Sequence, residues 1–277
     1  MTSFKVACIQ NTATRDIPAN IGWVCKRIDE AAAAGAEFIS LTETVGLIDP
    51  VNERLAEQVF SEADDFGLNA FIDKAAEHHV NILVGSQLIR DQSAIYNRSF
   101  LLDTTGAITA RYDKLHMFDI ELANGESYRE SDVITPGDKA VVVDAGFARI
   151  GLSVCYDLRF SALYRALAKA GAEIITIPAA FTQTTGKAHW HTLIRARAIE
   201  TGCYVVAANQ CGHHLDNRNS WGHSMVVDPW GEVLADAGSE PGVIYADIDI
   251  EAVARARSRI PVLQNERSFS VELVNAQ

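Results

Sequence analysis

The chain has 277 residues, of which 48% are hydrophobic and 22% are charged, and it carries a formal net charge of −12. This composition is typical of a globular protein, and the acidic balance argues against nucleic acid or an anionic membrane as a partner. No apolar run approaches the roughly 20 residues that a membrane-spanning helix needs.

The N-terminus and the cysteines indicate a reducing compartment. The chain starts directly in a strand-like segment and lacks the pattern of a secretory signal. The cysteines are odd in number and form no CxxC pair, which favours free thiols over a disulfide framework. We therefore expect a cytoplasmic protein with five free cysteines: Cys8, Cys25, Cys155, Cys203 and Cys211.

The first third of the chain alternates buried strands with amphipathic helices. Pro18 suits the first turn of a helix and Gly35 suits its end. The predicted order is a strand over 4–10, a helix between Pro18 and Gly35, a strand over 37–41, an acidic loop over 46–66, a helix around 68–75, and a strand over 81–86.

The middle of the chain predicts a hairpin and a long loop. Residues 96–102 and 107–112 flank residues 103–106 (DTTG), a hairpin signal. No period holds over 116–136, so we expect a long loop, which in a compact chain is usually functional. Two further strands are expected, over 140–143 and 147–154.

The second half repeats an earlier pattern. Residues 170–177 (AGAEIITI) match residues 34–41 (AGAEFISL) as a helix end, a glycine turn and a buried strand, which predicts two similar halves packed together. The other expected elements are a helix carrying Trp190 and closed by Gly202, a strand over 203–208, a hairpin of 224–227 and 232–235, a strand over 243–248, a helix over 251–257, and a tail over 259–277. Together they predict one α/β domain over 1–277, with layered helices and a mixed sheet.

Cys155 stands where an apolar run ends and a helical spacing begins, so we predict a strand, a sharp turn and a helix with this cysteine at the turn. Such a turn directs the free backbone N–H groups of the helix toward whatever the side chain attacks. The positive end of the helix favours a thiolate, the nucleophilic form of cysteine. A buried structural cysteine is the alternative.

A cysteine nucleophile needs a base and a positive group where the oxyanion forms. Glu43 follows a predicted strand end, Lys114 follows a predicted hairpin strand, and Glu130 lies in the predicted long loop. Each also fits an ordinary surface position, such as a solvated glutamate or a lysine paired with Asp113. Position alone leaves these alternatives open.

Histidines offer other chemistries. Cys155 with His116 or His223 is compatible with a Cys/His hydrolase. The glycines form no GxGxxG or P-loop motif, which argues against a nucleotide site. We predict no metal, because two histidine-rich groups match no standard zinc spacing: Cys211 with His213, His214 and His223, and His189 with His191.

Three segments, in this order, resemble the signature segments of the nitrilase superfamily of carbon–nitrogen hydrolases. They are Glu43 after its strand, residues 112–119 (YDKLHMFD) and residues 151–160 (GLSVCYDLRF). The resemblance extends over nearly the whole chain. It implies a four-layer α-β-β-α sandwich, with two mixed sheets face to face and helices outside, and a homodimer in which sheets and helices continue across the interface.

The resemblance also implies the site residues. Glu43, Lys114 and Cys155 would form a catalytic triad, and Glu130 would help to orient the lysine and the substrate. The implied reaction is hydrolysis of a small-molecule linear amide through a thioester on Cys155. Lys114 and the backbone N–H of Tyr156 would stabilise the oxyanion, and no metal or organic cofactor is required.

Within the superfamily, three further segments resemble the Nit branch: residues 188–190 (AHW), 195–200 (RARAIE) and 222–231 (GHSMVVDPWG). They are most similar to deaminated-glutathione amidases, whose sister group acts on omega-amides of 2-oxo acids. The chain departs from the family pattern at two places: Thr42 replaces a usual proline, and Ser161-Ala162 replace Pro-Glu. The second departure removes a carboxylate near the helix of the nucleophile and bears on substrate preference.

The pocket is expected to be lined by aromatic residues of the long loop and of the segment after residue 178: Tyr128, Phe181, His189 and Trp190. Packing in the core or an interface is the alternative for each. Three other functions stay open from the sequence: nitrile hydrolysis by the same triad, a Cys/His or metal-dependent hydrolase, and a non-catalytic binding protein on the hydrolase scaffold. The tail over 259–277 is expected to pack on a partner subunit.

Overall fold

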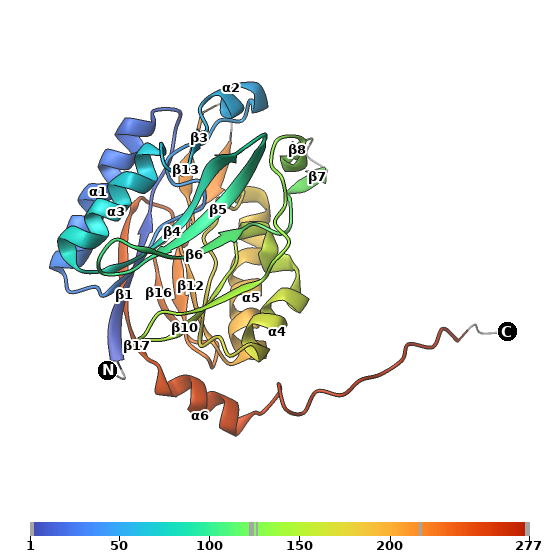
Figure 1. Ribbon diagram of the computed structural model, residues 1–277. Helices are drawn as coiled ribbons and strands as arrows, with labels where there is room; N and C mark the ends of the chain where they lie inside the picture. Colours follow the sequence, from blue (N-terminus) through green and yellow to red (C-terminus); the bar gives the residue numbers. More distant parts are fainter. Residues whose placement is uncertain (1–2, 122–124, 126, 216–217, 275–277) are drawn as a thin grey trace.

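The computed structural model describes residues 3–121, 125, 127–215 and 218–274, and its centre consists of two mixed sheets (Figure 1). The first sheet has seven strands, with β3 (Phe60–Ser61) paired only to β4. Its order is β17 (Gly242–Asp249), β1 (Ser3–Gln10), β2 (Phe38–Ser40), β4 (Asn81–Asp91), β5 (Ala94–Leu102) and β6 (Ile108–Asp113).

The second sheet has six strands. In both sheets the central strands pair in parallel and the strands at the two ends of the order pair antiparallel, whereas β3 pairs with β4 in parallel. Its order is β16 (Val233–Asp236), β15 (Met225–Val227), β12 (Tyr204–Ala207), β11 (Ile174–Thr176), β10 (Arg149–Leu152) and β9 (Val141–Asp144).

Helices cover the outer faces of the two sheets (Figure 1). One face carries α1 (Ile17–Ala33) and α3 (Phe66–His78), and the other carries α4 (Ser161–Lys169) and α5 (Gln183–Thr201). Two shorter helices lie outside these layers: α2 (Asn52–Glu57) and α6 (Glu251–Arg259).

Alternating side chains create two cores. In β1, Val6 and Cys8 belong to the core between the sheets, whereas Ala7 and Ile9 belong to the core under α1 and α3. Successive strand residues point to opposite faces, so a strand covered on both sides is apolar throughout. This arrangement confirms the predicted four-layer α-β-β-α sandwich.

The two halves use the same turn between helix and strand. Gly35 ends α1 and Gly171 ends α4, with φ of 84° and 96°, a backbone region that glycine enters without steric cost. Two residues later in each half, a glutamate donates its backbone N–H to the neighbouring strand: Glu37 to the Lys5 carbonyl at 2.9 Å, and Glu173 to the Arg149 carbonyl at 2.7 Å.

Some segments contain more secondary structure than predicted. Residues 46–66, predicted as loop, contain α2 and β3, and residues 116–136 contain a small hairpin and the 3-10 turn η1 (Glu130–Asp132). Strands of two or three residues are too short for an alternating pattern to show. The unpredicted pairs are β7 (Asp119–Glu121) with β8 (Ser127–Arg129), and β13 (Cys211–His213) with β14 (Asn219–Trp221).

The C-terminal segment leaves the layered body (Figure 1). Residues 261–274 contain no helix or strand, and Phe269 and Val271 are 86% and 88% exposed. Packing of residues 259–277 on a partner subunit stays a prediction, and residues 275–277 lie outside the described ones. Among the helices described, none has the length and the apolar character needed to cross a membrane.

Gly85 tests how the fold positions the segment after β2. A Cβ at Gly85 would lie 2.1 Å from the Leu41 carbonyl oxygen and 2.3 Å from that of Thr42, directly before Glu43. We expect Gly85→Ala to lower the free energy of unfolding by about 1–3 kcal/mol in urea denaturation, because the backbone must shift. The control is Gly22→Ala on the exposed face of α1, where a Cβ meets nothing within 4 Å. Equal stability of the two variants would contradict this account.

Candidate active site

Cys155 occupies a sharp turn after β10. Its φ is +48°, a left-handed conformation that costs a non-glycine residue about 1–3 kcal/mol. The turn is held by two hydrogen bonds: the Cys155 N–H donates to the Pro178 carbonyl at 2.8 Å, and the Val154 N–H donates to the Asp157 carboxylate at 2.8 Å. The predicted strand and turn are present, but a 3-10 turn, η2 (Cys155–Arg159), precedes the α-helix, which begins at Ser161.

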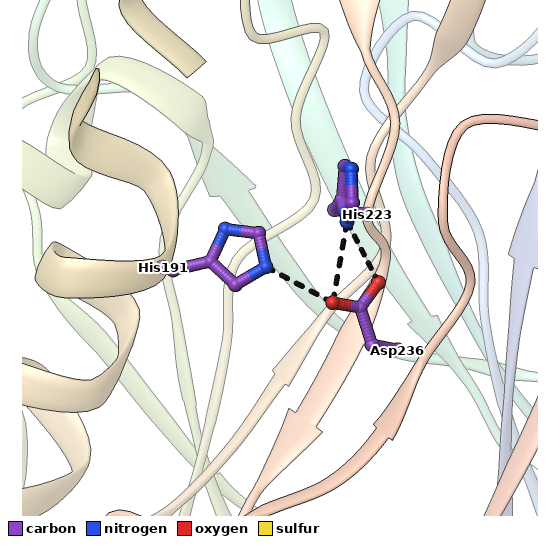
Figure 2. Close-up of side chains that lie close together, drawn as sticks. All are labelled: His191, His223 and Asp236. Carbon is purple, nitrogen blue, oxygen red and sulfur yellow. Dashed lines mark hydrogen bonds and ion pairs between the residues drawn. The ribbon is translucent and has the colours of Figure 1, made fainter. Parts of the chain in front are cut away.

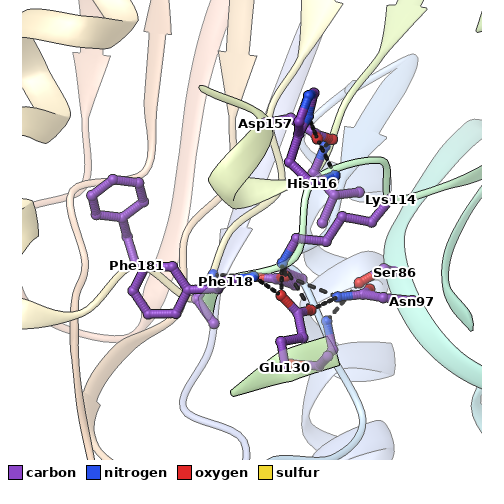
Figure 3. Close-up of polar contacts among 12 residues, drawn as sticks. Ser86, Asn97, Lys114, His116, Phe118, Glu130, Asp157 and Phe181 are labelled. Atoms are coloured by element: carbon purple, nitrogen blue, oxygen red, sulfur yellow. Dashed lines mark hydrogen bonds and ion pairs between the residues drawn. The ribbon is translucent and has the colours of Figure 1, made fainter. Parts of the chain in front are cut away.

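Asp157 connects this turn to the segment that carries Lys114. Its carboxylate is fully buried and accepts hydrogen bonds from the Tyr112 hydroxyl at 2.6 Å and from the His116 backbone N–H at 3.1 Å. The His116 ring nitrogen Nδ1 lies 2.6 Å away (Figure 3). No role for Asp157 was predicted from the sequence, because its partners lie 41 and 45 residues away in the chain.

Lys114 lies between two carboxylates (Figure 3). Its Nζ donates to Glu43 Oε1 at 2.8 Å and to the two carboxylate oxygens of Glu130 at 2.9 and 2.8 Å. The lysine is 2% exposed and Glu43 is 5% exposed. The structure therefore brings together residues from three predicted segments.

Neutral donors hold the two carboxylates in place. The Asn97 amide donates to Glu43 Oε1 at 2.9 Å and to Glu130 Oε1 at 3.3 Å, and the Ala180 N–H donates to Glu43 Oε2 at 2.8 Å. The Phe118 N–H donates to Glu130 Oε2 at 2.6 Å. Asn97 was missed from the sequence, where it is one polar residue on the predicted strand over 96–102.

The charges fix the resting protonation states. Burial raises the pKa of the Glu43 carboxyl, but the Lys114 ammonium and the hydrogen bonds to this carboxylate outweigh it, so the pKa lies below its usual value. Burial lowers the pKa of Lys114, yet Glu130 and Glu43 raise it well above its usual value. The cluster thus holds an ammonium beside ionised Glu43.

Cys155 is a thiol in this state. Burial and the Glu43 charge raise the pKa of the Cys155 thiol well above its usual value, and Lys114 opposes them only in part. This corrects the expectation that the positive end of the helix favours a thiolate. A buried, ionised carboxylate that interacts with a thiol is a candidate base for removing the thiol proton during attack.

Cys155 and the charge cluster line a cavity of about 420 Å³. Its walls come from the segment after β2, the β7–β8 hairpin and the segment after β11. The lining also contains the cations Arg129 and Arg218, and the Arg218 guanidinium lies 5.9 Å from the centre of the Tyr128 ring.

The four aromatic candidates divide into two pairs. Tyr128 and Phe181 line the cavity, as does the oxyanion candidate Tyr156. His189 is exposed and lies 3.3 Å from the Arg159 guanidinium. Trp190 is buried in the core, and its indole N–H donates a hydrogen bond to the His223 carbonyl. Neither of these two belongs to the lining that the described residues form.

The histidines proposed for a Cys/His pair also lie elsewhere. His116 stacks on Phe160 with ring centres 3.6 Å apart, and His223 pairs with Asp236. Among the described residues of the cavity lining, neither histidine is present. Glu43, whose charge acts on the Cys155 thiol and which lines the same cavity, is therefore the base candidate.

Thr42, the first departure from the family pattern, forms a hydrogen bond in the structure. The Thr42 hydroxyl is buried and donates to the side-chain oxygen of Asn11, whose amide donates to the Val45 carbonyl at 3.1 Å. Hydrogen bonds thus fix the segment that carries Glu43. Ser161, at the second departure, starts α4 and is exposed.

The comparison with known proteins places the chain in a family. The carbon–nitrogen hydrolase family model matches residues 5–258. Deaminated glutathione amidase of Synechocystis sp. is 37% identical over 96% of this chain and 98% of its own length, and omega-amidase NIT2 of Homo sapiens is 35% identical over 99% of both. The crystal structure of the C. elegans NitFhit protein has a TM-score of 0.89 and 34% identity, over 96% of this chain and 65% of that one.

The chain belongs to the carbon–nitrogen hydrolase family. This confirms the resemblance stated from Glu43 and from residues 112–119 and 151–160. The chain is thus a hydrolytic enzyme, and its fold is that of its structural neighbours.

Replacing Lys114 tests the charge cluster. We expect Lys114→Met to lower the free energy of unfolding at pH 7 by about 3–5 kcal/mol, because Glu43 would stay buried without its counterion. Without the ammonium, burial raises the pKa of Glu43, so the loss is largest above that pKa and shrinks as the pH falls and the carboxyl becomes neutral. Chemical denaturation at several pH values measures this.

The matched control is Lys169→Met. Lys169 pairs with Glu266 on the surface, where both side chains are at least one-third exposed, and such a solvent-screened pair contributes little to stability. A loss for Lys114→Met as small as that of the control, or one that does not depend on pH, would refute the predicted role of the ammonium.

Proposed function

We propose that Glu43, Lys114 and Cys155 catalyse the hydrolysis of a linear amide through a thioester. Glu43 removes the Cys155 proton while the sulfur attacks the amide carbonyl carbon. The Lys114 ammonium and the Tyr156 N–H donate to the oxyanion that forms. The main support is the buried Glu43 carboxylate, which lies 2.8 Å from the Lys114 ammonium and lines the same cavity as Cys155.

The remaining steps reuse the same groups. When the C–N bond breaks, Glu43 gives its proton to the leaving amine or ammonia, and a thioester remains on Cys155. Glu43 then takes a proton from water, the water oxygen attacks the thioester carbonyl, and the acid leaves as the thiol regains its proton. Glu130 stays hydrogen-bonded to Lys114 and keeps the ammonium in position. The cycle needs no cofactor.

The substrate we propose is an amide that bears a carboxylate, namely deaminated glutathione or a related omega-amide of a 2-oxo acid. The relatives are named for such amides. Arg129 and Arg218 supply positive charge to the cavity lining of an otherwise acidic chain. A volume of about 420 Å³ also accommodates an amide whose leaving group is larger than ammonia. The homodimer, the single domain over 1–277 and the cytoplasmic location stay predictions.

A substrate panel tests this function. We expect wild type to release amine or ammonia from deaminated glutathione or 2-oxoglutaramate faster than from simple aliphatic amides. Cys155→Ala should reduce the rate by about 10³-fold or more, because no covalent intermediate forms. Mass spectrometry of the quenched enzyme should find the acyl group on Cys155. Turnover of simple nitriles alone would keep the nucleophile and reject the amide assignment.

Arg218 tests the substrate class. We expect Arg218→Gln to raise KM for the carboxylate-bearing amide about tenfold or more, because one charge-assisted hydrogen bond contributes about 1.5–3 kcal/mol. The rate with a neutral analogue, in which the carboxylate is a methyl ester, should stay the same. Arg149→Gln, an exposed arginine 3.8 Å from Glu173, is the control. Equal effects on the acid and on its ester would exclude carboxylate recognition by Arg218.

A further inference from the structure

A second group of polar side chains, absent from the cavity lining that the described residues form, lies close together (Figure 2). His191 projects from α5, His223 lies between β14 and β15, and Asp236 ends β16. His191 Nε2 is 2.9 Å from Asp236 Oδ2, and His223 Nδ1 is 2.9 and 3.2 Å from the two carboxylate oxygens. The potential ligand atoms lie within 4.8 Å of one another.

The backbone and two tryptophans orient His223. Its φ is +55°, an uncommon conformation that is fixed by the bond from its N–H to the Gly238 carbonyl at 2.6 Å. The Trp190 indole donates to the His223 carbonyl at 2.8 Å, and the Trp221 ring stacks on the imidazole with centres 4.7 Å apart. The side chain is thus positioned by its surroundings before any ligand binds.

The carboxylate is fixed as well. Asp236 Oδ1 accepts the Gly238 N–H at 2.9 Å, and the carboxylate pairs with both imidazoles. Among the described residues, no lysine or arginine forms an ion pair with it. The side chains of His191, His223 and Asp236 are 39%, 25% and 30% exposed, so a small ion reaches them from solvent.

We propose that His191, His223 and Asp236 bind a divalent transition metal ion, with Zn²⁺ as the best fit. Two imidazole nitrogens and a carboxylate oxygen are typical zinc ligands, and water would complete a tetrahedral site. Zinc bonds of about 2.0–2.2 Å separate neighbouring ligand atoms by about 3.3 Å. The separations between imidazole nitrogen and carboxylate oxygen are 2.9 and 3.2 Å, and all the potential ligand atoms lie within 4.8 Å of one another, so small rearrangements would bring them to zinc geometry.

Another cluster in the chain shows what a competing cation does. Asp29, Glu77 and His78 also lie close enough to share an ion. There, however, Lys74 Nζ lies 2.7 Å from Asp29 and 2.8 Å from Glu77 and already supplies the positive charge. In the part of the chain that the structure describes, no lysine pairs with the His191 cluster, and this difference favours it as the metal site.

The proposed metal site is separate from the catalytic proposal. None of its three side chains belongs to the cavity lining formed by the described residues, and it does not require that Cys155 reacts. The metal site could not be recognised from the spacing of its residues, because Asp236 lies 45 residues after His191 and 13 after His223. The predicted absence of a metal rested on local zinc motifs, which cannot show ligands from three separate elements.

The test is a Zn²⁺ titration of the full chain after treatment with a chelator, followed by calorimetry. Cys155→Ala serves as the parent, because a thiol binds soft metals itself. We expect one Zn²⁺ per chain and a higher Tm with Zn²⁺ present. In this background, His191→Ala and Asp236→Asn should each weaken binding about tenfold or more and remove the Tm shift.

The matched control is His78→Ala, which removes a histidine from the cluster that Lys74 neutralises and should leave zinc binding unchanged. His191 and Asp236 are partly exposed, so both variants are expected to fold, and circular dichroism checks this. Absence of zinc binding in the parent would overturn the proposal. So would unchanged affinity in both folded variants, or an equal loss in His78→Ala.

Discussion

The buried contact between one ammonium and two carboxylates is the constraint on which this site depends. Burial of ions is costly unless each is paired and hydrogen-bonded. Lys114 supplies one positive charge for two glutamates, so neutral donors must complete the coordination of the carboxylates. Asn97 and the backbone N–H groups of Phe118 and Ala180 do so from three different parts of the chain. The fold is thus tied to the chemistry, because moving any of these segments leaves a buried charge with fewer partners.

The position of the nucleophile, Cys155, also depends on a buried carboxylate. A positive φ at Cys155 is sustained only if the surroundings enforce it. Asp157 provides this by accepting hydrogen bonds from the Val154 N–H, the Tyr112 hydroxyl and the His116 backbone N–H. These donors come from the cysteine turn and from the segment that holds Lys114. One buried carboxylate therefore sets the position of the thiol relative to the ammonium.

Most helices and strands could be predicted from the sequence, because local patterns encode them. Apolar patterns mark the strands, and Gly35 and Gly202 mark the ends of helices, to within a few residues. The roles of Glu43, Lys114 and Cys155 came from motif resemblance, because position alone left surface interpretations open. Asn97 and Asp157 gave no local signal, since their function lies in contacts with residues distant in the chain. The direction of the Cys155 pKa shift was also missed, because it depends on burial beside Glu43 and not on the turn.

The reacting groups were easier to place from the sequence than the walls of the cavity. The reacting groups lie at or just beyond the ends of regular strands, where periodic patterns position them. The cavity walls come in part from residues 46–66, predicted as an acidic loop, and from residues 116–136, where no period holds and where the short β7–β8 hairpin was not predicted. Irregular segments tolerate substitution because fewer buried backbone hydrogen bonds depend on them. The cavity walls can therefore change while the charge cluster of Glu43, Lys114 and Glu130 stays the same. For this reason the substrate has to be inferred from wall residues such as Arg218 and not from the triad.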